Sequence, residues 1–289
     1  MIKLKKKAFL SVNLAVLLFG LAGLFAKWIR LPALAITFGR VFFSSVALGL
    51  FLLLRKQSFR VGSRRDLLLL LCAGAILALH WWSFLASIQL ATVAIGTITF
   101  SSFPLFVIFL EPLAFRRKLS LRNLVFALII LAGVIVTVPE FSFANRTFAG
   151  IAAGMLSAFS YAVLTVMNKG FSERISGTLT AFYEQTAAAL VLLPFILGAH
   201  AQPSAADLGL LLLLGVVMTA AAHTLFISSL KSLPAQLAGL CSSMETVYGI
   251  VFAFLLLGEV PGLREILGAC LIVGTVIAAQ LSEGRTSKA

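Results

Sequence analysis

Charged side chains are scarce in this sequence, acidic ones most of all, and so is cysteine. Only 11% of the 289 residues are Asp, Glu, Lys or Arg, less than half the share of about 25% in soluble domains. Cys72, Cys241 and Cys270 each lie alone in an apolar run, without the close spacing of metal or redox sites. Walker A, H-E-x-x-H and G-x-S-x-G motifs are absent, which argues against an ATP-driven pump and against a hydrolase. We therefore expect no cofactor, no metal and no enzymatic activity.

The sequence instead contains many long hydrophobic segments. Hydrophobic residues make up 61% of it and its mean hydropathy is +1.08, where soluble domains have about 45–50% apolar residues. A helix that crosses the bilayer needs about 20 apolar residues. Ten runs approach that length: 9–29, 33–54, 66–89, 91–112, 121–139, 147–168, 178–198, 206–230, 234–257 and 263–281. The fold class predicted is an all-α integral membrane protein with ten transmembrane helices and no soluble domain.

The second half of the chain repeats the first. A shift of 141 positions superimposes residues 66–140 on residues 207–281 without a gap. Gly74 then matches Gly215, and Gly133 matches Gly274, with the hydropathy pattern repeated throughout. The domains predicted are a first repeat at 1–140 and a second at 141–289, each with five helices. Because five is odd, the second repeat must enter the bilayer from the opposite side, which is the inverted repeat of alternating-access transporters.

Basic residues indicate the orientation of the helices. With the N-terminus in the cytoplasm, all but five of the 23 Lys and Arg residues lie on the cytoplasmic side or at cytoplasmic helix ends. The five others are Lys27, Arg30, Arg146 and Arg264 on the outer side, and Arg40 inside a helix. This asymmetry follows the positive-inside rule. It predicts a multi-pass protein of the inner (plasma) membrane with both termini cytoplasmic, and it explains the net charge of +13 without a nucleic-acid partner. Anionic lipid binding by the basic loops is the alternative.

Several stretches carry a resemblance to a known family. They are the segment 94–138, with Pro104 in an apolar run, basic residues at 116–118 and the sequence Leu-Ala-Gly-Val at 131–134, and the second-repeat segment with Gly258-Glu259 before 263–277. Over nearly its whole length the chain resembles EamA-type proteins of the drug/metabolite transporter superfamily. Residues 102–105 and 111–113 look most like bacterial exporters of aromatic and neutral amino acids. Two departures are visible, since Arg117-Lys118 replaces the usual Gly-Glu and Glu245 aligns with Pro104.

Transporters with inverted repeats bind substrate near the midplane, between the repeats and at interrupted helices. Pro104 predicts such an interruption, because it removes one N–H donor and frees the carbonyl of Phe100. We interpret Pro104 as a hinge; a packing kink without ligand contact is the alternative. His80, Phe84 and Phe100 would line a cavity with aromatic faces and an imidazole. A histidine hydrogen-bonded between helices is the alternative for His80.

Glu245 is the sharpest single candidate, because a carboxylate near the bilayer centre is costly and usually functional. It would neutralise a substrate ammonium group, couple transport to protons, or pair with a buried cation such as Lys169 or Arg40. Arg40 and Glu184 occupy corresponding positions in the two repeats and look like structural anchors. The predicted substrate-binding residues are His80, Phe84, Phe100, Ser101, Tyr161, Ser242 and Glu245.

The resemblance and these residues together predict a secondary exporter of small amphiphilic metabolites, neutral or aromatic amino acids above all, that works by alternating access. A multidrug or lipid translocator of the same superfamily is one alternative, and an intramembrane lipid-modifying enzyme is another. The expected partners are a small-molecule substrate and the lipid bilayer. Matching small residues, Gly133 with Thr137 and Gly274 with Ala278, also suggest a helix-packing seam or a homodimer.

Overall fold

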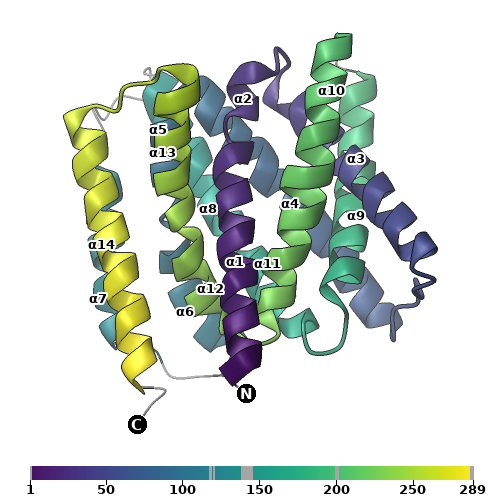
Figure 1. Cartoon of the computed structure of the whole chain (residues 1–289), viewed down its shortest axis with the longest axis horizontal. Helices are drawn as coiled ribbons and strands as arrows, with labels where there is room; N and C mark the ends of the chain where they lie inside the picture. The colour runs from purple at the N-terminus through teal and green to yellow at the C-terminus, as the bar shows by residue number, and fades with distance from the viewer. Residues whose placement is uncertain (1, 117–118, 120, 138–145, 199–201, 287–289) are drawn as a thin grey trace.

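Helices account for nearly all of the described chain. The computed structural model describes residues 2–116, 119, 121–137, 146–198 and 202–286, and contains no strand within them. The helices stand side by side as an upright bundle, with both ends of the chain at the same end of it (Figure 1). Their bounds are α1 Ile2–Ala22, α2 Phe25–Trp28, α3 Ala33–Leu54, α4 Arg64–Leu90, α5 Val93–Phe100, α6 Phe103–Phe115, α7 Leu121–Thr137, α8 Arg146–Phe171, α9 Gly177–Leu197, α10 Ala205–Leu213, η1 Leu214–Ala221, α11 Ala222–Leu230, α12 Ala235–Ser242, α13 Met244–Leu257 and α14 Leu263–Thr286.

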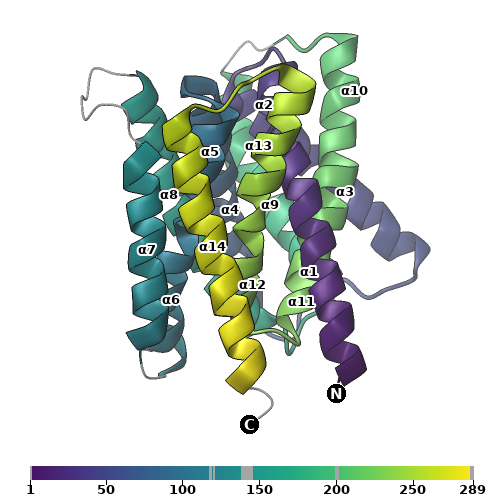
Figure 2. The ribbon, with the colours of Figure 1, turned by 60° about the vertical axis from the view of Figure 1, so that its left-hand side comes forward.

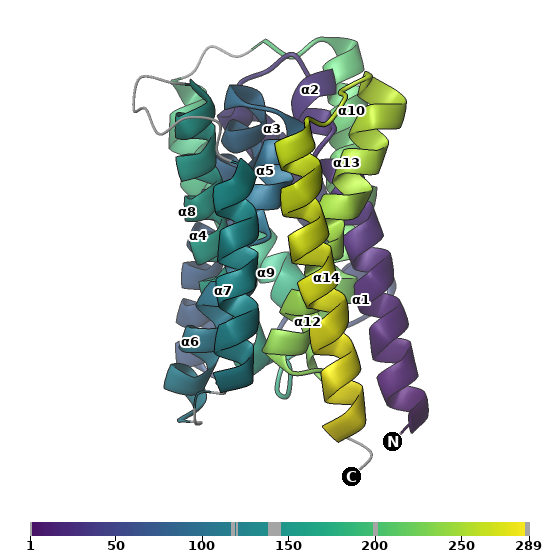
Figure 3. The same cartoon turned by 90° about the vertical axis from the view of Figure 1, so that its left-hand side faces the viewer.

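Eight helical stretches of the described chain are long and apolar enough to cross a membrane. They are Lys7–Trp28, Ala33–Leu54, Arg64–Leu90, Val93–Phe115, Arg146–Phe171, Gly177–Leu197, Ala205–Leu230 and Ala235–Leu257. Leu, Val and Phe side chains remain exposed along the outside of most of them, as a lipid-facing surface requires. The protein is therefore membrane-embedded and all-helical. α7 and α14, the remaining long helices, pack against each other along one side of the bundle (Figure 3).

The predicted helix-packing seam at Gly133 lies between two helices of the same chain, α7 and α14. A Cβ added at Gly133 would lie 3.0 Å from Ile272 Cγ1 and 3.1 Å from the carbonyl oxygen of Gly268, so α7 and α14 approach closely there. Gly274, its partner under the 141-residue shift, has open space around it. The close approach at Gly133 thus belongs to the packing of one chain, and the homodimer stays a prediction.

Two membrane-length segments are broken into two helices at corresponding positions. The first breaks at Ser101–Ser102, between α5 and α6, and the second at Ser243, between α12 and α13. Residues 102 and 243 correspond under the 141-residue shift. The breaks also touch, because the hydroxyls of Ser101 and Thr246 are hydrogen-bonded and Thr246 Oγ1 donates to the carbonyl of Thr97 at 3.0 Å.

The predicted position of the first interruption was wrong by a few residues. Pro104 does not lie in the middle of a continuous helix; it lies in the first turn of α6, after α5 has ended at Phe100. The first turn of a helix has no intrahelical partner for its N–H groups, so proline costs little there. Serine side chains hold the break instead, with Ser101 Oγ donating to Thr97 O at 3.0 Å and Ser102 Oγ donating to Thr99 O at 2.8 Å.

Glycines allow two close helix crossings beside the centre of the bundle. Gly74 of α4 packs on the backbone of α9 at Glu184 and Ala188. Gly215 packs in the same way on α3, where a Cβ would lie 2.9 Å from the carbonyl oxygen of Arg40. Gly215 is the second residue of the π-helical stretch η1, whose wide turn lets Thr219 Oγ1 donate to Leu214 O at 2.7 Å. The two crossings fix the depth at which Arg40 and Glu184 lie.

Candidate functional site

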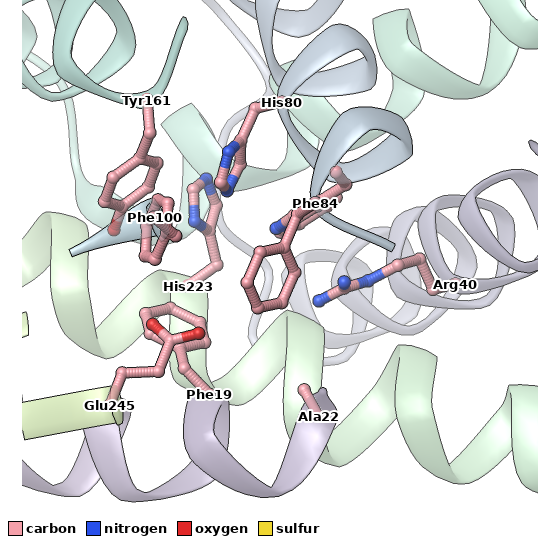
Figure 4. Close-up of a pocket in the computed structure, with 10 residues that line it drawn as sticks. Phe19, Ala22, Arg40, His80, Phe84, Phe100, Tyr161, His223 and Glu245 are labelled. Carbon is pink, nitrogen blue, oxygen red and sulfur yellow. The ribbon is translucent and has the colours of Figure 1, made fainter. Parts of the chain in front are cut away.

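A small cavity lies at the centre of the bundle. Its volume is about 20 Å³, and seven of the helices surround it. Figure 4 shows its lining side chains, which converge from both halves of the sequence: Phe19 and Ala22 of α1, Arg40 of α3, His80, Trp81 and Phe84 of α4, Phe100 of α5, Tyr161 of α8, His223 of α11 and Glu245 of α13. A cavity needs about 10–15 Å³ to hold one water molecule. The site as it stands therefore has room for water but not for an organic substrate.

One wall of the cavity is an aromatic cluster centred on His80. The His80 ring lies 4.6 Å from the ring of Tyr161 and 5.3 Å from that of Phe100, measured between centroids. Its Nδ1 atom is hydrogen-bonded to α8, with Ser157 Oγ at 2.9 Å and the Ser157 carbonyl oxygen at 3.2 Å. Both interpretations of His80 therefore hold, because it lines the cavity and also links two helices. Phe84 completes the wall, 5.3 Å from Phe100.

Arg40 brings a guanidinium to the cavity from the opposite side. Its Cζ atom lies 3.9 Å from the centroid of the Trp81 ring, which is a close cation–π contact. Its Nε atom donates to Thr219 Oγ1 at 3.1 Å. The side chain is 1% exposed, and no carboxylate of the described residues lies within 4 Å of its nitrogens. A buried cation without an ion-pair partner is costly in a membrane interior and suits a site that receives an anion.

Glu245 supplies the opposite charge. Because the helix breaks at Ser243, Glu245 lies in the first turn of α13, where the positive end of the helix dipole favours a carboxylate. It is 5% exposed and makes no hydrogen bond to another described side chain. In Figure 4 its carboxylate and the guanidinium of Arg40 approach the cavity from different sides, with Phe84 between them. The cavity thus has a carboxyl group and a guanidinium separated by an aromatic surface.

His223 and Glu184 form a buried pair beside this cavity. Nε2 of His223 lies 2.7 Å from Oε2 of Glu184, and both side chains are at most 1% exposed. His223 lines the cavity and also meets Trp81 edge to face, with ring centroids 5.5 Å apart. Trp81 therefore contacts both Arg40 and His223. Among the described residues no group of three or more His, Cys, Asp or Glu side chains is close enough to hold a metal ion.

The model of one transporter family matches this chain twice, over residues 6–138 and 148–279, and its description is "EamA-like transporter family". The chain belongs to this family. The resemblance seen in the sequence is confirmed, and with it membership of the drug/metabolite transporter superfamily.

Relatives of this EamA-like protein cover most of its length. An uncharacterised transporter of Bacillus subtilis (strain 168), YxxF, is 26% identical over 93% of this chain and 88% of its own. A protein of Rickettsia conorii named as an S-adenosylmethionine uptake transporter is 26% identical over 88% of this chain and 85% of its own. One solved crystal structure superposes with a TM-score of 0.75 at 21% identity, covering 97% of this chain and 99% of that one. That similarity shows that the two proteins share a fold.

Both ends of the EamA-like bundle are closed by matching contacts. At one end Lys27 Nζ donates to the carbonyl of Ala91 at 3.0 Å and lies 3.7 Å from Glu259 Oε1. At the other end Lys169 Nζ donates to the carbonyl of Leu230 at 2.7 Å. Each lysine thus binds the C-terminal end of a neighbouring helix, a favourable position for a cation.

A carboxylate near each end binds the start of a broken segment. Glu259 Oε2 accepts from the backbone N–H of Val93, the first residue of α5, at 3.0 Å. Glu111 Oε2 accepts from that of Gln236, in the first turn of α12, at 3.1 Å. α5 and the end of α13 lie at one end of the bundle, and α6 and α12 toward the other (Figure 2). A carboxylate contact thus joins the two halves of the sequence at each end of the bundle.

The structure brings together most of the residues predicted from the sequence. Five of the seven predicted substrate-binding residues line the cavity: His80, Phe84, Phe100, Tyr161 and Glu245. The other two, Ser101 and Ser242, are buried behind it. Ser101 links the two helix breaks, and Ser242 Oγ donates to the carbonyl of Ala238 at 3.1 Å.

Sequence reasoning missed several lining residues. Arg40 looked like a structural anchor, yet its guanidinium lines the cavity. Phe19 gave no signal, because one Phe in an apolar helix is indistinguishable from core packing. The depths of Trp81 and His223 relative to each other depend on the π-helical stretch before α11, which composition does not reveal.

Proposed function

We propose that this EamA-like protein is a secondary transporter that exports small zwitterionic, amphiphilic metabolites from the cytoplasm, with neutral and aromatic amino acids as the best-fitting class. The single observation that carries the proposal is the pair of opposite charges, Arg40 and Glu245, at an aromatic cavity in the centre of the bundle. An amino acid carries a carboxylate, an ammonium group and an apolar side chain. Arg40, Glu245 and the aromatic cluster around His80 offer one partner for each.

The electrostatics of the site favour a zwitterion over a singly charged ligand. A zwitterion with its carboxylate at Arg40 and its ammonium at Glu245 gives each buried charge a partner, while the net charge of the interior stays the same. A ligand with only one charged group leaves Arg40 or Glu245 unpaired, and leaving a buried charge unpaired costs about 3–5 kcal/mol. Selectivity for zwitterions then follows from the burial of both side chains.

Substrate binding requires this cavity to enlarge, which is what alternating access would provide. An amino acid occupies far more than the present 20 Å³. Separation of the Lys27 and Glu259 contacts would open the bundle at one end, and separation of the Lys169 contact would open it at the other. Because the two sets of contacts lie at opposite ends, either can break while the other holds. Pro104, next to the α5–α6 break, is the proposed hinge.

The proposed architecture is ten transmembrane helices in two inverted repeats, residues 1–140 and 141–289. The double match of the family model supports it, as do the two corresponding helix breaks. Further support comes from the packing, since α4 packs on α8 and α9 while the η1–α11 stretch packs on α1 and α3. Ser45 and Thr186, 141 residues apart, are hydrogen-bonded to each other at 2.7 Å. A pair of corresponding residues in contact is expected on the pseudo-two-fold axis of such a repeat.

The proposed location is the inner (plasma) membrane, with both termini in the cytoplasm. Support comes from the position of the two chain ends at one end of the bundle. The basic α3–α4, α6–α7 and α8–α9 connections are predicted on that same side by the positive-inside rule.

Ligand-induced thermal stabilisation of the purified protein tests the substrate class. A ligand that binds the folded state raises the unfolding temperature in proportion to its affinity. L-Phenylalanine is compared with phenethylamine, which lacks the carboxylate, and with 3-phenylpropionate, which lacks the ammonium group. We expect stabilisation by phenylalanine and much weaker effects of the other two at equal concentration. Equal stabilisation by all three would contradict recognition of a zwitterion and favour a multidrug translocator.

A second candidate substrate is a sulfonium-bearing amino acid. The Rickettsia relatives are named as S-adenosylmethionine uptake transporters, and a sulfonium cation would be attracted to Glu245 and to the faces of Phe84 and Phe100. Adding S-adenosylmethionine to the same thermal series tests this candidate. Stabilisation by S-adenosylmethionine that exceeds that by phenylalanine would make it the preferred substrate and would favour uptake as the direction.

A further inference from the structure

The His223–Glu184 pair lies outside the substrate contacts proposed above, yet it has unused bonding capacity. His223 Nε2 and Glu184 Oε2 are 2.7 Å apart, while His223 Nδ1 and Glu184 Oε1 have no hydrogen-bond partner among the described residues. Both side chains are at most 1% exposed. A buried polar atom without a partner is rare in folded proteins and calls for an explanation. Here two such atoms belong to the same hydrogen-bonded pair.

Two further buried amides, on α8 and α9, lack a contact with hydrogen-bond geometry. The amide of Asn168 faces Glu184 from α8, close enough to interact with its carboxyl group. The other amide is that of Gln185, next to Glu184 on α9. All four side chains are essentially buried. Polar groups in this number, in an otherwise apolar bundle, are the usual marks of an ion or proton pathway through a membrane protein.

The charges of the interior indicate which ion the pair receives. Arg40 carries a positive charge, and Glu245 and Glu184 each carry a negative one when ionised, while neutral histidines add nothing. The centre of the bundle then holds one net negative charge, which is costly in a low-dielectric environment. One proton on His223 removes that charge and turns the 2.7 Å contact into a charge-assisted hydrogen bond. A single monovalent cation is therefore sufficient.

Trp81 connects the pair to the substrate cavity. The guanidinium of Arg40 lies 3.9 Å from the Trp81 ring, and the His223 ring lies 5.5 Å from it. A positive charge on His223 therefore interacts electrostatically with Arg40, since both groups contact Trp81. In the same way, a carboxylate bound to Arg40 interacts with His223. Such mutual influence between two binding sites is reciprocal by thermodynamic necessity.

We propose that His223 and Glu184 form the proton-binding site of this transporter, and that Trp81 and Arg40 couple it to the bound substrate. The role in transport rests on the proposed function; the binding of a proton does not. Other titratable and charged groups share the cavity with His223: Arg40 of α3, His80 of α4, Tyr161 of α8 and Glu245 of α13, while α1 contributes the apolar Phe19 and Ala22. None of these groups is within hydrogen-bonding distance of His223.

Tryptophan fluorescence tests proton binding without any substrate. The variant Trp28→Phe/Trp82→Phe leaves Trp81 as its one tryptophan, because the chain has three. A protonated imidazole beside the indole quenches it, so we expect a single pH-dependent change of Trp81 emission in the purified protein. Adding His223→Gln should remove that change.

His80→Gln is the matched control for this titration. The His80 ring is also close to Trp81, at 6.2 Å between centroids, and it lies in the same cavity. The fluorescence change should survive in His80→Gln. A change that persists in His223→Gln, that disappears in His80→Gln, or that is absent from the parent variant would overturn the proposal. Thermal unfolding of each variant confirms that the fold is intact.

A transport arm separates this inference from the proposed function. Proteoliposomes that exchange labelled phenylalanine without a pH gradient should accumulate it when a gradient is imposed, and Glu184→Gln should keep exchange while losing accumulation. Exchange without any response to the gradient in the unmodified protein would overturn the coupling and leave the function standing. If phenylalanine is not exchanged, the proposed substrate class fails, and the fluorescence titration still decides whether the pair binds a proton.

Discussion

Replacing Arg40 with methionine is the sharpest test of how the cavity recognises its substrate. The Arg40 guanidinium is 1% exposed and lies over Trp81 at 3.9 Å. Methionine keeps an unbranched apolar stem against that ring. Loss of the Arg40 guanidinium also leaves the Thr219 hydroxyl with a partner, since Thr219 Oγ1 donates to Leu214 O at 2.7 Å. The substitution therefore removes mainly one charge.

The size of the effect follows from the burial of that charge. Removing one partner of a buried, hydrogen-bonded charge pair costs about 2–5 kcal/mol, and each 1.4 kcal/mol is a factor of ten in affinity. The affinity for phenylalanine should therefore fall by between about 30-fold and several thousand-fold. Binding of phenethylamine, which has no carboxylate to lose a contact, should not weaken, and without Arg40 the amine should gain relative to the amino acid.

Isothermal titration of the two ligands into both proteins supplies the four affinities of a double-mutant cycle. The reasoning predicts a coupling energy of at least about 1.5 kcal/mol between Arg40 and the substrate carboxylate, which is the lower end of values found for close charge pairs. Equal losses for phenylalanine and phenethylamine would refute a direct contact with Arg40. They would show that the arginine supports the shape of the cavity instead. Thermal unfolding of Arg40→Met without ligand measures any structural cost separately.

Three further predictions concern the other charge, the helix crossing and the hinge. Glu245→Gln should weaken binding of phenylalanine and phenethylamine but not of 3-phenylpropionate, measured by the same titration, while the pH response of Trp81 fluorescence remains. Gly215→Ala should lower the unfolding free energy by about 1–3 kcal/mol, because the added Cβ would lie 2.6 Å from Phe43 Cβ. Gly209→Ala, in open space on the adjoining α10, is the control and should leave the unfolding free energy unchanged. Equal losses of unfolding free energy in denaturant titrations of the two variants would contradict this packing argument. Pro104→Ala should slow phenylalanine exchange more than it weakens binding, and an unchanged exchange rate would remove the hinge role.

The all-helical, membrane-embedded fold was predictable because it depends on the apolar pattern of the sequence. Apolar runs of membrane length and a constant 141-residue shift are visible without any knowledge of contacts. Glu245 and His80 attracted attention for the same reason, since a titratable residue in an apolar run is expensive and must have a partner or a function. The described structure confirms an all-helical, membrane-embedded chain.

Other features were not predictable because they depend on how helices cross. Arg40 and Glu184 occupy matching positions, and the sequence gives both the same interpretation. In the structure Arg40 lines the central cavity, and Glu184 is hydrogen-bonded to a histidine of that cavity. The difference arises from their neighbours: Arg40 meets Trp81, whereas Glu184 meets His223. Neither neighbour lies nearby in the sequence, so only tertiary packing distinguishes the two residues.

The position of the helix break also could not be predicted from the sequence. Proline is a strong signal for an interruption, but it is tolerated in the first turn of a helix as well as at a kink. The serines at 101 and 102 end α5 by hydrogen-bonding to their own helix, and their effect is too dependent on context to be read from composition.

Flux of labelled phenylalanine across proteoliposomes tests the central claim most directly. Vesicles that contain the purified protein and are preloaded with unlabelled phenylalanine should take up the labelled amino acid saturably, and threonine should compete while lysine should not. Vesicles with Arg40→Met or Glu245→Gln protein should lose that uptake at the same substrate concentration. Uptake no greater than in protein-free vesicles, or uptake that both variants retain in full, would contradict the account of a zwitterion transporter built around this cavity.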